Sequence, residues 1–276
     1  MKQILTHINP DLDAVCSCWL IRRFLPDWDK AEIGFVKSGK MKGVDEDTDV
    51  LYVDTGWGKL DHHQTSECLS ASKLALDFIL KKTKGRDFSD LEKEALEKIV
   101  GVVTEIDNAR DISWPEVGEF RYYFYLHSLI DGLRGLAFSD ERVMKIGFSL
   151  LDSVLLNFKS TIRAKEELGE GMVFESPWGK SLGIVTANRH LLWVAEVEGY
   201  VTVIIKDPKT GAVRIYARPD SQVDLSSLAD QIKEVDETGD WFLHASKKLL
   251  LNQSSTNPGM KPTSLSLEKM ISFLKR

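Results

Sequence analysis

The sequence is short of cysteine, with three in 276 residues. Cys16, Cys18 and Cys68 are too few for the disulfide framework of a small secreted domain, and free thiols suit a reducing compartment. Because Cys16 and Cys18 lie within an apolar helical pattern, we expect them to be buried and inert rather than metal ligands. We therefore do not expect disulfide bonds to hold the fold together.

The sequence also lacks long apolar runs. No stretch of about 18 apolar residues occurs, so we expect no membrane-spanning helix. The first residues, MKQILTHINPDLDA, contain an apolar run that is too short for a signal peptide, and acidic residues follow at once. We therefore expect a cytoplasmic protein with no membrane partner.

Positive charge is not in excess. Lys and Arg number 36 against 42 Asp and Glu, which gives a formal net charge of -6. Proteins that bind long nucleic acids usually carry a basic face, so duplex DNA is not an expected partner. This balance still allows a local basic pocket for a small phosphorylated ligand.

The N-terminal pattern predicts alternating strands and helices. QILTH (residues 3–7) is short and followed by Asn-Pro, which indicates a strand that ends in a turn. Residues 11–25 have helical apolar spacing, with Asp11 at the expected N-cap. Residues 31–39 and 48–56 predict two further strands, the second with the continuous apolar character of a sheet buried on both faces. This order favours an α/β fold whose parallel sheet carries helices on both faces.

The rest of the chain divides into a helical part and a mixed part. Residues 69–168 are mostly helical in pattern, with one helix expected over 120–138. Residues 169–181 mix Gly, Ser and Pro and form the expected linker. We therefore predict two domains, 1–168 and 182–276, the second being a smaller mixed α/β domain.

The second predicted domain has its own signals. Three strand-like runs occur, and DPKTG between the last two indicates a hairpin turn. Two short helices follow, with Asp224 as the expected N-cap of the first and Ser266 or Ser264 as that of the second.

Imidazole and carboxylate side chains recur at the ends of the predicted elements. They follow the first strand, the third strand and a helical stretch, and they include an Asp-His-His triplet: His7, Asp11, Asp13, Asp54, Asp61, His62, His63 and Asp107. Taken singly, Asp11 can be a helix cap and Asp54 a turn former. Because ligand sites in parallel α/β sheets form at the carboxyl ends of strands, their joint occurrence favours one shared site.

The residue types indicate which ligand this site would take. Two imidazoles and several carboxylates without a thiolate suit Mn²⁺ or Mg²⁺, and Zn²⁺ is also compatible. So many carboxylates in one pocket would repel one another unless cations neutralise them. The set is large enough for two ions, and a pair of metal ions can activate water and stabilise both oxygens of a phosphoryl displacement.

Four segments resemble the motifs of a known family. HINPDLDA, VDTG, LDHHQ and EIDNA are similar to the four motifs of the DHH phosphoesterase superfamily, which is named for the triplet that stands here as Asp61-His62-His63. Its members include single-strand exonucleases, oligoribonucleases, cyclic dinucleotide phosphodiesterases and manganese-type inorganic pyrophosphatases. The resemblance implies a site with two divalent metal ions, usually Mn²⁺ with Mg²⁺, Co²⁺ or Zn²⁺ as alternatives, that activates water to hydrolyse a phosphoester or phosphoanhydride.

The resemblance also implies a role for each motif residue. One metal ion would be bound by His7, Asp11 and Asp54. The other would be bound by Asp13, Asp54, His62 and Asp107, with Asp54 bridging the two. His63 would contact the substrate phosphate, and Asp61 would orient a histidine. Asn9 would position the first loop or contact the substrate.

The chain departs from the superfamily pattern in two places. The gap between Asp54 and the triplet is short, where several members have a further helix and strand. The C-terminal Gly-Gly-His signature of many members is replaced here by GDWFLHASKKLLLN, which retains His244. YARPDSQVDLSSLADQI resembles the segment before that signature, which makes Arg218 the expected phosphate contact, with Lys247 beside His244. These three residues are expected to form an anionic-substrate pocket facing the metals across a cleft between the domains.

Three functions are compatible with the sequence. The first is a metal-dependent phosphoesterase that acts on a small phosphorylated substrate, such as a short single-stranded oligonucleotide or a nucleotide-like phosphodiester or monoester. The second is an inorganic pyrophosphatase, which needs a tight pocket of lysines and arginines. The third is a non-catalytic metal- or nucleotide-binding relative. The sequence leaves open whether the protein forms a homodimer.

Overall fold

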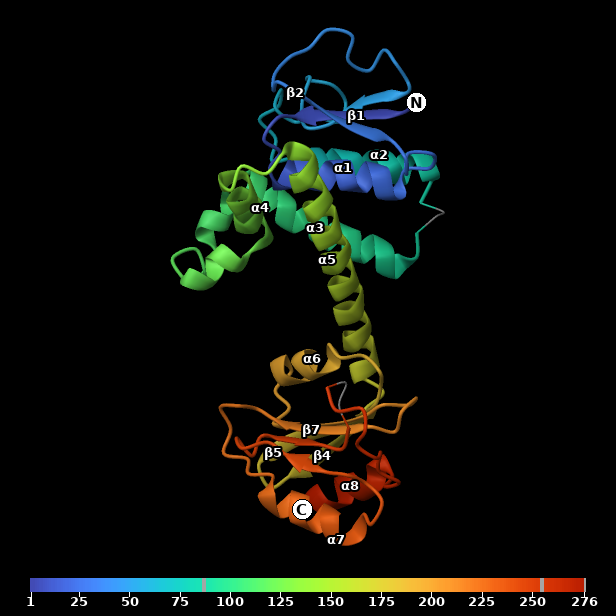
Figure 1. The fold of residues 1–276 in the computed structure, drawn as a ribbon, viewed down its shortest axis with the longest axis vertical. Helices are drawn as coiled ribbons and strands as arrows, with labels where there is room; N and C mark the ends of the chain where they lie inside the picture. The colour runs from blue at the N-terminus through green and yellow to red at the C-terminus, as the bar shows by residue number, and fades with distance from the viewer. Residues whose placement is uncertain (86–87, 254–255, 276) are drawn as a thin grey trace. The chain divides into compact units, whose positions relative to one another are not determined.

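The structure is a computed structural model that describes residues 1–85, 88–253 and 256–275. The chain divides into two compact units, Met1–Lys159 (unit 1) and Ser160–Arg276 (unit 2). Each unit has its own β-sheet with helices packed on it (Figure 1). No helix in these ranges is both long and apolar enough to cross a lipid bilayer.

The sheet of unit 1 has three parallel strands in the order β2-β1-β3. They are β1 (Gln3–His7), β2 (Glu32–Val36) and β3 (Val50–Tyr52). β1 is central, with His7 opposite Val36 of β2 and Leu5 opposite Tyr52 of β3. Because the strands are parallel, their carboxyl ends meet at one edge of the sheet, where β1 ends in His7 and Asp54 follows β3.

Five helices begin in unit 1. They are α1 (Leu12–Phe24), α2 (Ala71–Thr83), α3 (Asp90–Asp107), α4 (Leu126–Gly135) and α5 (Asp140–Leu168), with the 3-10 turns η1 (Arg110–Ser113) and η2 (Phe120–Phe124) before α4. α1 begins where the Asp11 side chain accepts the Ala14 N–H, and it ends just before Pro26, which cannot continue a helix. α1 is buried along most of its length because it packs against β1, α2 and α3. Its buried Trp19 donates its indole N–H to Asp152 of α5 at 3.1 Å.

Unit 2 is built on a six-stranded mixed sheet in the order β4-β5-β6-β7-β9-β8. Its elements are β4 (Met172–Ser176), β5 (Gly179–Val185), α6 (Leu191–Val197), β6 (Thr202–Lys206), β7 (Val213–Ala217), α7 (Ser226–Val235), β8 (Phe242–Leu243), β9 (Leu249–Leu251) and α8 (Leu267–Leu274). β5 and β6 are parallel, and the other pairs are antiparallel.

Helices cover both faces of the unit 2 sheet. Ile204 of β6 and Ile215 of β7 belong to a core cluster with α7 and α8. Val203 and Ile205, the neighbours of Ile204, belong to a second cluster with α6. This alternation follows from the strand geometry, in which successive side chains point to opposite faces. In Figure 1, α6 accordingly lies on one side of the sheet and α7 and α8 on the other.

The predicted fold class is confirmed. Unit 1 has a parallel sheet with helices, and unit 2 has a mixed sheet with helices. The first strand is found over the predicted residues 3–7, DPKTG joins the antiparallel pair β6 and β7, and Ser266 caps α8 through its side chain. Cys16 and Cys18 are buried, as expected. The predicted domain ranges stay a prediction, and the expected linker over 169–181 contains β4 and the start of β5.

Two local predictions were wrong. Residues 120–138 do not form one helix, because the backbone of Tyr125 is extended between η2 and α4. The aromatic residues here have modest helix propensity, and the rings of Tyr122, Tyr125 and His127 pack on one another instead. Asp224 does not cap α7, because the N-cap position belongs to Leu225, and Asp224 accepts the Ser226 N–H while pairing with a lysine.

Candidate metal centre

Four segments of unit 1 bring the predicted acidic and imidazole side chains together. These segments are the turn from β1 into α1, the residue pair after β3, the loop that carries the Asp-His-His triplet, and the C-terminal end of α3. Three overlapping groups of potential ligand atoms result: His7, Asp11 and Asp54; Asp54, His62 and His63; and Asp13, His62 and Asp107. Within each group the ligand atoms lie within 4.8 Å of one another.

Asp54 lies at the centre of this cluster. It is 2% exposed, and its carboxylate lies 3.2 Å from His7 Nε2, 3.4 Å from His62 Nε2 and 3.7 Å from His63 Nδ1. Its backbone φ is 58°, in the left-handed region that a non-glycine residue seldom adopts. The Asp54 N–H donates to the Leu60 carbonyl at 3.0 Å, which helps to hold the residue in this conformation. Such backbone strain is often found at functional sites.

His7 is oriented by the backbone of the next residue. Its Nδ1 lies 2.9 Å from the Ile8 carbonyl oxygen, which can only accept, so Nδ1 carries the proton. In the neutral ring, Nε2 then presents a lone pair toward the carboxylates of Asp54 and Asp11, at 3.2 and 3.8 Å. Lone pairs that face one another in this way need a positive partner between them. A backbone carbonyl that fixes the tautomer is a common partner of metal-binding histidines.

Asp11 and Asp13 each have a second contact on a helix. Asp11 Oδ1 accepts the Ala14 N–H at the start of α1, while Oδ2 faces His7. Asp13 is buried, and its two oxygens accept the N–H groups of Ala71 and Ser72, at 2.6 and 2.8 Å, at the start of α2. This anchoring of Asp13 was not predicted from the sequence, although SASKLAL after a turn carries the signal of a helix start.

His62 links Asp13 and Asp54 to Asp107. Its Nε2 lies 3.4 Å from Asp107 Oδ2 and 3.7 Å from Asp13 Oδ2. Asp107 is the last residue of α3, and Asn108 after it donates to the Leu69 carbonyl at 2.9 Å, which joins this helix end to the segment before α2. Two helix termini and the triplet loop therefore meet at His62.

Asp61 and His63 form a pair at the exposed side of the cluster. Asp61 is buried, and its Oδ1 lies 2.7 Å from His63 Nδ1, while its Oδ2 accepts the Trp57 N–H at 2.8 Å. The His63 side chain is 47% exposed. Asp61 therefore orients His63 and leaves its Nε2 side open. Asn9 lies apart from this pair, exposed, with its N–H donating to Asp140 at 3.2 Å.

Burial and crowding shift the pKa values of the carboxyl groups. Burial, with the charges of Asp54 and Asp107, raises the pKa of Asp13 well above its usual range. Burial likewise raises the pKa of Asp107 to about 6. Burial also opposes ionisation of Asp54, but contacts with His62 and His7 outweigh it and lower the pKa of Asp54 to about 2. The cluster therefore crowds negative charge around Asp54 and needs positive charge to balance it.

The pKa values of the two inner histidines, His62 and His7, are both raised. Contact with Asp54 is the main cause that raises the pKa of His62 to about 9. Burial alone would lower the pKa of His7, but contacts with Asp54, the Ile8 carbonyl and Asp11 raise it to about 9. In the protein alone, protons on the imidazoles supply the positive charge that the carboxylates need.

The donor set fits a divalent cation. Asp54 Oδ1 and His62 Nε2 are buried and make no hydrogen bond to any residue that the structure describes, although they lie 3.4 Å apart. Buried polar atoms are normally hydrogen-bonded, so two adjacent unpaired ligand atoms indicate another partner. Carboxylate and imidazole ligands without thiolate suit Mn²⁺, Mg²⁺ or Zn²⁺.

Three of the residues predicted to bind substrate, Arg218, His244 and Lys247, lie in unit 2, and each is paired locally. Arg218 forms an ion pair with Asp220 at 2.7 Å, and Lys247 forms one with Asp224 at 2.9 Å. The Nδ1 of His244 lies 2.8 Å from the Ser246 hydroxyl. Arg218 lines a shallow pocket with Trp178 and Val201, whose lining residues do not include the other two. The substrate roles of Arg218, His244 and Lys247 stay predictions.

The fold and this cluster define an α/β protein with carboxylate–imidazole groups that could bind metal ions. The sequence matches no protein-family profile and no curated protein. Among solved structures, the chain is similar to an uncharacterised protein from Helicobacter pylori G27, with 12% identity, a TM-score of 0.27 and coverage of 99% of this chain and 98% of that one.

The chain is also similar to RecJ from Thermus thermophilus. The structure of RecJ in complex with Mn²⁺ gives 11% identity and a TM-score of 0.29, with coverage of 94% of this chain and 50% of RecJ. The structure in complex with Mg²⁺ gives 11% identity and a TM-score of 0.28, with coverage of 94% and 48%. This chain therefore spans about half the length of RecJ. All three likenesses are distant.

Proposed function

We propose that the protein is a metal-dependent phosphoesterase that hydrolyses a small phosphorylated substrate, either a short oligonucleotide or a nucleotide-like phosphodiester or monoester. The observation that carries the proposal is the set of three ligand groups in which Asp54 links two groups and His62 links two. The resemblance of the same segments to the DHH superfamily motifs gives independent support. An acidic chain fits a small substrate better than a long duplex.

The proposed centre holds two divalent ions, with Mn²⁺ the first choice. His7, Asp11 and Asp54 would bind one ion. Asp13, Asp54, His62 and Asp107 would bind the other, with Asp54 common to both. When bound, such ions lower the pKa of water and neutralise charge on the phosphoryl oxygens.

His63 is the proposed contact for the substrate phosphate. Asp61 accepts a hydrogen bond from His63 Nδ1–H, and in a ring that also carries a proton on Nε2, the Nε2–H can donate to an anionic oxygen. Because phosphoryl transfer depends mainly on positioning and charge stabilisation, a fixed donor beside the cluster favours the transition state. Asp61 is therefore proposed as a positioning residue and His63 as a catalytic one.

The test is a hydrolysis screen of the full chain with added Mn²⁺. Substrates are bis(p-nitrophenyl) phosphate, p-nitrophenyl phosphate, a set of dinucleotides and pyrophosphate, with the products identified. We expect hydrolysis of at least one phosphoester that is lost in Asp54→Asn. The matched control is Asp131→Asn, which removes an exposed carboxylate of unit 1 that pairs with Arg134.

Other outcomes separate the alternatives. Phosphate release from pyrophosphate alone would favour the pyrophosphatase. Binding of Mn²⁺ and nucleotides without any product would favour the non-catalytic relative, and either result would reject the phosphoesterase. The metal centre itself would be rejected if Asp54→Asn bound Mn²⁺ as well as the unchanged protein does.

A further inference from the structure

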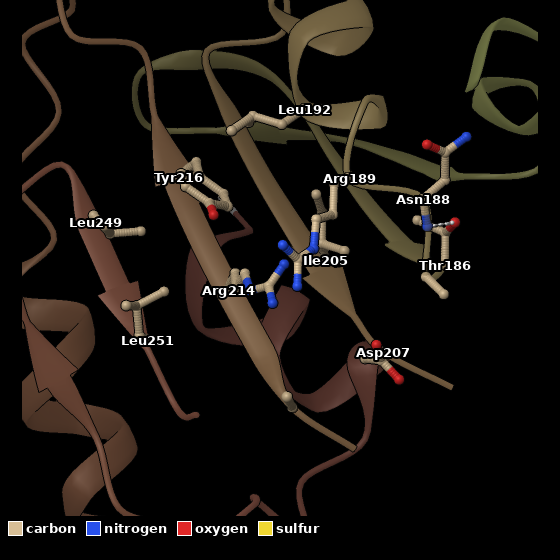
Figure 2. Close-up of a pocket in the computed structure, with 12 residues that line it drawn as sticks. Thr186, Asn188, Arg189, Leu192, Ile205, Asp207, Arg214, Tyr216, Leu249 and Leu251 are labelled. Carbon is tan, nitrogen blue, oxygen red and sulfur yellow. Dashed lines mark hydrogen bonds between the residues drawn. The ribbon is translucent and has the colours of Figure 1, made fainter. Parts of the chain in front are cut away.

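A second candidate site lies wholly within unit 2. It is a pocket of about 400 Å³ on the face of the sheet that carries α6. Pockets that bind small molecules typically have volumes of roughly 300–1,000 Å³. Figure 2 shows Arg189 and Arg214 among the residues that line it, with both guanidinium groups pointing into the pocket. Neither arginine was singled out in the sequence.

The two arginines come from different elements but are each held in place. Arg214 is on β7, two residues before Tyr216, so strand geometry puts both side chains on the same face. Arg189 is in the loop after β5, next to Asn188, whose side chain donates to the Ser160 carbonyl and accepts the His190 N–H. The loop therefore fixes the backbone from which Arg189 extends.

Neither guanidinium group is paired with another described residue. Within the part of the chain that the structure describes, the side chains of Arg189 and Arg214 form no ion pair and no hydrogen bond. The one carboxylate in the described pocket lining is Asp207, whose Oδ1 accepts the N–H groups of Lys209 and Thr210 in the β6–β7 turn. These hydrogen bonds, and to a smaller extent the charge of Arg214, lower the pKa of Asp207. Two like charges in one pocket repel, so an anion between the arginines would be stabilised.

Part of the remaining lining is aliphatic and aromatic, and Thr186, Asn188 and Asp207 add polar groups. Leu192, Ile205 and Leu249 provide aliphatic surface, and Tyr216 provides an aromatic ring beside Arg214. An inorganic anion would use only the arginines and leave this apolar surface exposed to water. A ligand with a phosphate and a flat, weakly polar ring uses both parts of the lining, because base–aromatic stacking and arginine–phosphate pairing are separate contributions.

We propose that this pocket binds a nucleoside monophosphate, with the phosphate between Arg189 and Arg214 and the base against Tyr216 and the leucines. The inference depends on unit 2 alone. It holds whether or not the cluster in unit 1 hydrolyses phosphoesters. It also gives unit 2 a nucleotide site that does not need Arg218, His244 or Lys247.

The test is calorimetric titration of the full chain with AMP, adenosine and inorganic phosphate in the presence of a chelator. The chelator prevents nucleotide binding through metal ions in unit 1. We expect AMP to bind at least about tenfold more tightly than phosphate or adenosine, since each of these lacks one group of contacts. Arg189→Gln and Arg214→Gln should each weaken AMP binding by about tenfold or more.

Two further variants make the test specific. Tyr216→Ala should weaken AMP binding about fivefold or more while leaving phosphate binding unchanged. Arg163→Gln is the matched control, because Arg163 is an exposed arginine of unit 2 outside the pocket lining, and it should bind AMP like the unchanged protein. Circular dichroism shows whether each variant folds. If Tyr216→Ala does not fold, Arg189→Gln still tests the proposal, because Arg189 is exposed.

The proposal is overturned by any of three results. These are no AMP binding at millimolar concentration, equal affinity for AMP and phosphate, or equal AMP affinity in Arg214→Gln and Arg163→Gln. Such a result would leave the phosphoesterase proposal untouched, because hydrolysis is measured with Mn²⁺ and depends on Asp54. Conversely, if no phosphoester were hydrolysed, AMP binding in the presence of the chelator would still be expected.

Discussion

The candidate metal centre of unit 1 and the arginine pocket of unit 2 are opposite in charge and construction. The centre crowds carboxylates around the buried Asp54 and opposes them with imidazoles at 3.2 to 3.7 Å. The pocket places two arginines beside aliphatic and aromatic side chains, without an ion pair for either arginine among the described residues. The centre therefore suits cations, whereas the pocket suits an anion with an apolar part.

The two sites also differ in what holds them in place. The centre depends on element ends, since Asp11 caps α1 and Asp13 accepts two N–H groups at the start of α2. The pocket depends on one face of a sheet and one loop. A substitution that disturbs the centre of unit 1 should therefore leave ligand binding in the pocket of unit 2 unchanged, and the reverse should also hold.

The largest expected effect comes from the core beneath the centre. Trp19 is 1% exposed and bonded to Asp152, so Trp19→Ala should lower the free energy of unfolding of unit 1 by about 3–5 kcal/mol. Trp193 of unit 2 is 69% exposed, so the control Trp193→Ala should change stability by no more than about 0.5 kcal/mol. Urea unfolding followed by circular dichroism measures both. Similar losses for the two variants would contradict the packing described for α1.

The second effect tests whether Asp13 serves the centre through its charge. Asp13→Asn keeps the shape of the side chain but replaces a proposed carboxylate ligand with a neutral amide, so Mn²⁺ affinity should fall by at least about 100-fold, the upper end of the loss caused by removing an outer partner of a ligand. Calorimetric titration with Mn²⁺ measures it, with Asp131→Asn as the control. AMP binding under chelation should not change. An unchanged Mn²⁺ affinity would show that Asp13 only holds the start of α2 in place and does not serve the metal site.

These two sites also show what local sequence can and cannot predict. The sequence predicted the features that depend on neighbouring residues. These features are the strand at residues 3–7, the helix capped by Asp11 and the Asp-His-His triplet. The left-handed backbone of Asp54 is held by Leu60, and Asp13 is held by residues 58 and 59 positions away. The sequence shows the start of α2, but the contact between that helix start and Asp13 arises only from folding.

The same limit explains the differences in unit 2. β8 and β9 are strands of two and three residues, too brief for a clear alternation of apolar residues. β4 has five residues, but the Gly, Ser and Pro of residues 169–181 around it indicated a linker. Arg189 and Arg214 line one pocket because β5, β6 and β7 pair, which no spacing within the sequence states. The motif segments instead predicted Arg218, His244 and Lys247 as the substrate contacts. In the structure Arg218 and Lys247 each pair with a neighbouring carboxylate, and His244 contacts Ser246.

The third prediction separates positioning from metal binding within unit 1. Asp61→Asn should lower kcat about 10- to 100-fold, because His63 loses the carboxylate that orients its ring. Mn²⁺ affinity should change little, because the two Asp61 oxygens contact His63 and the Trp57 N–H. Steady-state kinetics and Mn²⁺ titration together measure this. A parallel loss of Mn²⁺ affinity would show that Asp61 supports the centre directly.

The smallest effect concerns the pH dependence of unit 2. Burial opposes ionisation of Asp236, but hydrogen bonds from Thr263, Trp241 and the Gly239 N–H outweigh burial and lower its pKa below the usual 3.8. A carboxyl whose pKa is lower in the folded state stabilises the fold at pH values above its unfolded pKa. That stabilisation is lost as the pH falls through the folded pKa. Unit 2 should therefore lose stability below about pH 4.

The variant Asp236→Asn tests this assignment. It removes the titrating group while keeping an oxygen that can accept from Trp241, so the acid-induced loss in unit 2 should shrink. Asp230→Asn, an exposed carboxylate on α7, is the control and should keep the full dependence. Thermal melts at a series of pH values measure both. Acid should reduce AMP binding only by unfolding unit 2 or protonating the phosphate. If AMP binding fell before unit 2 unfolded and at a pH where the phosphate is still charged, a carboxylate would have to support the pocket, and Asp207 is the carboxylate in its described lining.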